Sequence, residues 1–121
     1  ERFAAVNSAQ GARSQKLADQ RASVYGETAR TADLGKVIEA SDAFHLVIAE
    51  ITGNPRVIAQ LKLTLEYVHR LDRLSTQKER SWIPHGEILA ALEARRPSEA
   101  RQAMATHIDY ARDRMLRLFA P

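Results

Sequence analysis

The stretch "SDAFHLVIAEITGN", residues 41–54, decides the fold because it contains the end of one helix and the start of another. Gly53 suits the left-handed residue that commonly closes a helix. Asn54 can cap a following helix, with Pro55 at the first helical position, where proline is well tolerated. The stretch therefore predicts two helices joined by a tight turn.

Helical periodicity extends outward from this turn over nearly all of the 121 residues, and no sustained strand alternation is present. The expected helices cover residues 1–9, 13–30, 33–52, 55–75, 84–95 and 97–119, with Asp33 as the cap of the third. Short connections between amphipathic helices make neighbours antiparallel. We therefore expect residues 1–121 to form one all-α domain, an antiparallel helical bundle of about six helices.

The charge and composition exclude several classes of protein. The net charge is +3 and the pI about 9.6, but arginines alternate with carboxylates, as in "RLDRLSTQKER", so we predict a solvated surface rather than a DNA-binding stripe. The absence of cysteine excludes disulfides and thiolate metal sites, and fits a reducing, cytoplasmic location. The longest apolar run is "ILAAL", residues 88–92, so we expect neither a membrane span nor a membrane partner.

Three histidines lie on the apolar stripes of three different expected helices. His45 belongs to the third helix, His85 opens the fifth, and His107 follows Met104 on the last. An imidazole in an apolar core is costly unless its nitrogens have partners. Two alternatives stay open: each ring bonds a carbonyl or carboxylate in an ordinary core, or the three neutral rings converge on a metal ion.

A fourth ligand would come from the turn of helix before His45. Ser41 lies about 40° and Asp42 about 60° round the helix from His45, so either side chain can share its face. The fourth histidine, His69, lies beside the apolar stripe of its helix, and we interpret it as a half-exposed polar position outside the site.

Three strings together resemble a known family: "FHLVIAEITGNP" (44–55), "PHGEILAALEARRPSEARQAM" (84–104) and "THIDYARDRM" (106–115). In order and spacing they resemble the effector-binding FCD domain of GntR-type transcription regulators of the FadR subgroup. The separations of 40 and 22 residues between the three histidines also match that family's pattern. The resemblance covers residues 31–119 well and the first 30 residues weakly.

The resemblance implies a sensor and not an enzyme. In such proteins an N-terminal winged-helix domain contacts DNA, and we expect it to lie outside this chain, which opens at Glu1 and is expected to be a fragment. The metal-binding branch of the family holds a divalent cation such as zinc, nickel or manganese with three histidines and an aspartate, and the ion helps to bind a small carboxylate effector.

Carried onto this chain, the resemblance implies that His45, His85 and His107 are metal ligands. The family's aspartate usually stands four residues before the first histidine, where this chain has Ser41. Asp42 stands three residues before it and is our predicted fourth ligand, because both spacings lie on one helix face. Whether Asp42 or Ser41 completes the site is left open.

An anionic effector also needs cationic partners. Arg70 and Arg73 are our candidates for effector binding, because guanidinium groups bind carboxylates in a bidentate fork. The alternative is a solvated pairing of these arginines with Glu66 or Asp72.

The expected protein partner is a second copy of the chain, because palindromic operators mirror two-fold protein symmetry. Exposed apolar residues of the first two helices, such as Phe3, Val24 and Tyr25, are candidates for the dimer face.

Two other functions compete with the sensor. A metal-dependent, hydrolase-like helical enzyme would use the same histidines to activate water, but the sequence has no His-Glu-x-x-His helix and no nucleophile signature. A metal-free helical interaction module would use the histidines only as core residues. A sensor binds metal and a small acid without turnover, an enzyme consumes the acid, and a plain module binds neither.

Overall fold

The computed structural model describes residues 11–21, 34–74 and 85–119. These residues form a helix at 11–21, α2 (Leu34–Thr52), α3 (Pro55–Leu74), α4 (Gly86–Glu93) and α5 (Pro97–Phe119). In these ranges every element is a helix, which confirms the all-α class. The six-helix antiparallel bundle stays a prediction, because the expected first helix at 1–9, part of the second and the cap Asp33 lie outside the described residues, as do Phe3, Val24 and Tyr25.

The turn between α2 and α3 has the predicted geometry. Gly53 adopts a left-handed φ of 68°, and its N–H donates to the carbonyl of Glu50 at 3.0 Å. Asn54 Oδ1 then accepts from the backbone N–H of Arg56 at 3.0 Å, which caps α3 at its first turn. Local sequence signals thus produce the helical hairpin that positions the residues of α2 against those of α3.

The connection between α4 and α5 is a second tight reversal. The N–H of Arg96 donates to the carbonyl of Ala91 at 3.0 Å, and the N–H of Arg95 donates to Leu92 at 3.1 Å. This pair of bonds is a Schellman motif, and Arg95 takes its left-handed position with φ 56°. Because the motif stops α4 at Glu93, α5 starts at Pro97 and returns along α4. The sequence had predicted a start at Pro84, outside the described residues, and an end near Arg95.

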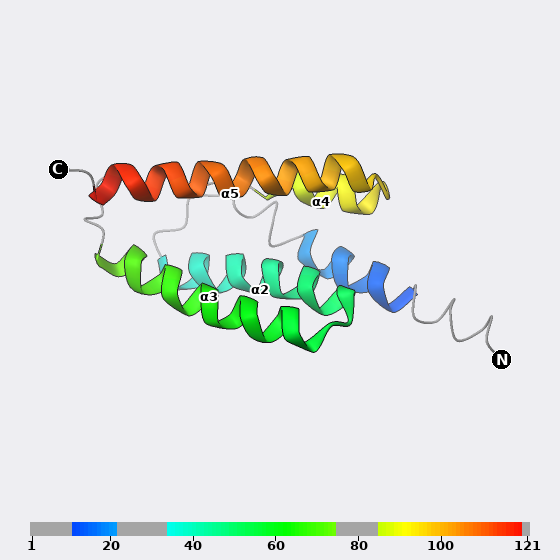
Figure 1. The fold of residues 1–121 in the computed structure, drawn as a ribbon. Helices are drawn as coiled ribbons and strands as arrows, with labels where there is room; N and C mark the ends of the chain where they lie inside the picture. The colour runs from blue at the N-terminus through cyan, green and yellow to red at the C-terminus, as the bar shows by residue number, and fades with distance from the viewer. Residues whose placement is uncertain (1–10, 22–33, 75–84, 120–121) are drawn as a thin grey trace.

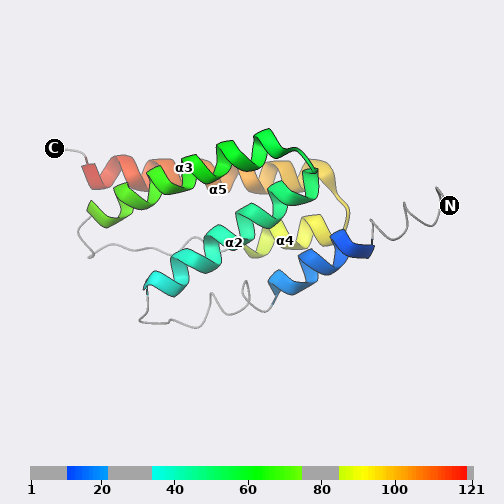
Figure 2. The ribbon, with the colours of Figure 1, turned by 90° about the horizontal axis from the view of Figure 1, so that it is seen from below.

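The helices form two layers with the core between them. Figure 1 shows α4 and α5 on one side and α2, α3 and the helix at 11–21 on the other, and Figure 2 shows the same arrangement from below. The buried core cluster is Phe44 from α2 with Ile88 and Leu89 from α4. Partly buried apolar residues pack against this cluster from the other elements: Leu17, Ile48, Leu92, Ala103 and Met104. Residue 45 therefore lies next to the core, on the helix that joins the two layers.

A search of the described helices finds none that is long and apolar enough to cross a membrane.

Candidate metal centre

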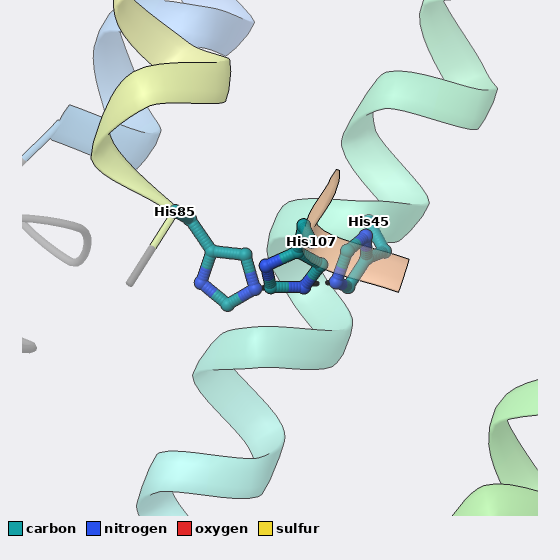
Figure 3. Close-up of side chains that lie close together, drawn as sticks. All are labelled: His45, His85 and His107. Atoms are coloured by element: carbon teal, nitrogen blue, oxygen red, sulfur yellow. Dashed lines mark hydrogen bonds between the residues drawn. The ribbon is translucent and has the colours of Figure 1, made fainter. Parts of the chain in front are cut away.

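Three histidine rings from three helices meet beside the core. His45 lies within α2, His85 is the N-cap residue of α4, and His107 lies within α5. One ligand nitrogen from each ring lies within 4.8 Å of the other two. Figure 3 shows the rings pointing toward one another. The structure thus brings together the three histidines that the sequence had predicted to converge.

Local structure explains the direction of each ring. His85 caps α4 through its backbone carbonyl, which accepts from Leu89 N–H at 3.1 Å, while its side chain makes no capping hydrogen bond. Its ring is instead turned toward α2, where its Nε2 lies 3.2 Å from Nε2 of His45. His107 shares a helix face with the buried Ala100 and with Met104, because these positions repeat every three or four residues.

The cluster lies against an apolar wall. Phe44 and His85 are each only 1% exposed, and their ring centroids are 4.7 Å apart. The Phe44 ring also meets His45 edge-on at 5.6 Å. Burial in these surroundings, together with the charges of His85 and His107, lowers the pKa of His45 to about 4. At neutral pH His45 is therefore uncharged, the form whose ring nitrogen can accept a proton or bind a metal.

The separation of the two Nε2 atoms fits a metal site. Zinc–nitrogen bonds of about 2.0–2.1 Å at a tetrahedral angle place two nitrogen ligands about 3.3 Å apart. The observed 3.2 Å between His45 and His85 is close to that value. In the metal-free chain the same distance is a hydrogen bond, in which one ring donates through Nε2–H and the other accepts. Three imidazole nitrogens without thiolate suit zinc, nickel, manganese or iron, so the residues present fit a divalent ion.

The structure separates the two side chains that were considered for the fourth position. Asp42 lies outside the group of converging ligand atoms, and its Oδ1 accepts from His69 Nε2 of α3 at 2.9 Å. Ser41 lies on the other side, with its Oγ 3.5 Å from Nε2 of His85. The side chain of α2 that faces the cluster is therefore Ser41, whereas Asp42 faces α3.

Sequence reasoning missed the role of His69. We had interpreted it as a half-exposed polar position, and its side chain is indeed only 23% exposed, but it forms an ion-pair contact with Asp42 across the α2–α3 interface. A signal was present, because Asp42 and His69 lie on opposite sides of the turn at Gly53, and an antiparallel hairpin brings such positions onto neighbouring turns.

The two predicted effector-binding arginines lie near the end of α3. Arg70 is exposed on that helix, next in sequence to His69. Arg73 also belongs to α3, but its side chain lies outside the described residues, as does that of Asp72. Their role in binding an effector stays a prediction.

A separate open groove of about 590 Å³ runs along α4 and α5. Its lining is mostly small or polar: Glu87, Ala90, Ala91, Ala94, Arg96, Glu99, Gln102, Ala103 and Thr106. None of the three histidines lines this groove, so its shape does not bear on the metal centre.

Comparison with known families gives one result. The family model described as the FCD domain matches residues 1–110, a span that includes the three histidines. No curated protein and no solved structure matches the chain.

Proposed function

The chain belongs to the FCD domain family, the effector-binding domain of GntR-type regulators of the FadR subgroup, and from this premise we propose that it is the ligand-sensing domain of a transcription regulator. Its three-histidine cluster binds a divalent metal ion of the zinc, nickel or manganese class, and a small carboxylate effector binds at that ion. The observation that carries the proposal is the convergence of three ring nitrogens within 4.8 Å, contributed by three separate helices.

Each residue of the cluster has a part in this proposal. His45, His85 and His107 hold the ion through ring nitrogens, and the burial that lowers the pKa of His45 keeps a lone pair ready at neutral pH. Phe44 covers one side of the rings and excludes water there. When bound, the ion supplies a Lewis-acidic position for a carboxylate oxygen. Arg70 and Arg73 are the proposed cationic partners of the effector.

The position of the cluster suggests how binding is transmitted. His45 comes from one layer of helices and His85 and His107 from the other, so an occupied site favours one arrangement of the two layers. In the proposed regulator this arrangement sets the position of a separate winged-helix domain, through which alone the protein contacts DNA. The domain spans residues 1–121, forms a homodimer and acts in the cytoplasm.

The regulatory family argues against the hydrolase-like alternative. Water activation at a metal also needs a general base close to the attacking water. Among the residues that the structure describes, the converging group contains histidines but no carboxylate, and Asp42 is bonded to His69 instead. We therefore propose binding without turnover, which chromatography of a candidate acid after incubation with the zinc-loaded chain would check.

The direct test is calorimetric titration of zinc into the chelator-stripped chain and into two variants. We expect one ion per chain in the wild type and loss of this binding in His107→Ala, because two nitrogens remain where three converged. Thr106→Ala, a change at the neighbouring exposed position of α5, is the matched control and should bind as the wild type does. Equal stoichiometry in the wild type and His107→Ala would overturn the ligand assignment. Absence of binding in all three would overturn the metal site itself.

A further inference from the structure

Two adjacent residues of α2 make contacts in different directions. Ser41 Oγ lies 3.5 Å from Nε2 of His85, whereas Asp42 Oδ1 lies 2.9 Å from Nε2 of His69 on α3. A carboxylate has no proton to donate at neutral pH, so His69 donates through Nε2–H. Both partners of this pair are 23% exposed, so the contact is partly sheltered from water.

Asp42 is nevertheless within reach of the three-histidine cluster. It stands three residues before His45, and residues three apart lie on one face of a helix. A change of side-chain rotamer, with no change in the backbone, would redirect its carboxylate from α3 toward the ring of His45. The contact with His69 opposes this change, because a hydrogen bond to a charged acceptor is stronger than one between neutral groups.

The direction of Asp42 matters because of charge. Three neutral imidazoles leave a divalent ion with its full positive charge, whereas a carboxylate ligand would cancel part of it. The ion is then held less tightly, and its remaining positions are left to oxygen ligands from outside the chain. Ser41, the α2 side chain next to His85, offers only a neutral hydroxyl.

We infer that His69 is a positioning residue that holds Asp42 away from the three-histidine cluster and thereby limits the affinity of the cluster for a divalent ion. The inference rests on the proposed metal site. It gives a function to a contact between α2 and α3 that lies outside the ligand set, and it makes metal affinity depend on a competition between His69 and the ion for one carboxylate.

The test compares zinc affinities, measured against a chromophoric chelator, in the wild type and a cycle of variants. His69→Ala should bind zinc about tenfold more tightly, the lower end of the changes that residues around metal ligands produce, because Asp42 is released. Asp42→Asn should bind as the wild type does, since this carboxylate is not a ligand while His69 holds it. The double variant, His69→Ala with Asp42→Asn, should lose the gain.

Two further variants separate positioning from a general structural effect. His69→Gln keeps an N–H donor and should retain wild-type affinity, whereas His69→Leu keeps apolar bulk without a donor and should behave as His69→Ala, even if the alanine variant folds poorly. Ser41→Asp supplies a carboxylate beside His85 independently of His69 and should tighten binding in either background.

The outcomes distinguish the inference from its premise. Wild-type affinity in both His69→Ala and His69→Leu, or a gain that persists in the double variant, would overturn the role of His69 while leaving the metal site standing. Failure of every variant to bind zinc would overturn both. A gain that disappears with Asp42→Asn and is absent in His69→Gln supports the inference.

Discussion

At the scale of single residues, the environment of His45 makes the folded chain sensitive to acid. Its ring packs against Phe44 and lies close to His85 and His107, and burial and the neighbouring charges lower its pKa from 6.5 to about 4. A group with a lowered pKa binds fewer protons in the folded state than in the unfolded state. Between these two pKa values, acid therefore favours unfolding through His45.

The first prediction follows from that sign. The free energy of unfolding of the chelator-stripped chain should be largest, as far as His45 is concerned, above pH 6.5 and should fall as the pH drops from 6.5 toward 4. The loss due to this residue should be up to about 3 kcal/mol, since one unit of pKa corresponds to about 1.4 kcal/mol. Thermal melts followed by circular dichroism across this range would measure it. His45→Gln should show a shallower decline, and identical slopes would contradict the assignment.

The local turn signals could be predicted from residues, whereas the Asp42–His69 contact could not. Gly53 and Asn54 specify the α2–α3 turn through their own backbone and side-chain preferences, which need no partner elsewhere in the fold. The direction of Asp42 depends instead on which side chain of α3 comes to face it. Helical spacing limited Asp42 to a face that it shares with His45, but tertiary packing chose between two rotamers.

At the scale of elements, the α4–α5 turn keeps two of the three histidines in register. His85 precedes α4 and His107 lies in α5, so the angle between these helices sets the distance between the two rings, whose centroids are 4.5 Å apart. The sequence predicted a short connection here from Pro97, and α5 does run from Pro97 to Phe119. It did not predict the left-handed Arg95, because the usual signal for that conformation is a glycine.

The second prediction concerns this turn. A non-glycine residue in the left-handed region costs about 1–2 kcal/mol, because its Cβ approaches the following carbonyl. Arg95→Gly should remove most of this cost and, after the extra entropy of glycine in the unfolded chain, should stabilise the chain by about 0.5–1 kcal/mol. Chemical denaturation would measure the change. As a control, Ala94→Gly, at the right-handed C-cap of α4, should be neutral or destabilising. A destabilised Arg95→Gly would show that the arginine side chain outweighs the backbone strain.

At the scale of the whole molecule, the metal centre lies where the two layers of helices meet. The core cluster of Phe44, Ile88 and Leu89 already joins α2 to α4 through apolar contact. The histidines add a polar junction at the same place, with one ring from the α2–α3 layer and two from the α4–α5 layer. An ion held by all three rings binds only the folded arrangement, since the unfolded chain separates the rings by 40 and 22 residues.

The third prediction is that zinc stabilises both layers together. At a free concentration about 100 times the dissociation constant, a ligand that binds only the folded state adds about 2.7 kcal/mol, which for a chain of this size raises the Tm by about 10 °C. Hydrogen exchange should slow in α2 and in α5 alike, because the ion joins His45 to His107 across the layers. In His107→Ala both effects should disappear. Protection confined to α4 and α5 would mean that His45 is not a ligand, and the link from an occupied site to a movement of one layer against the other would then fail.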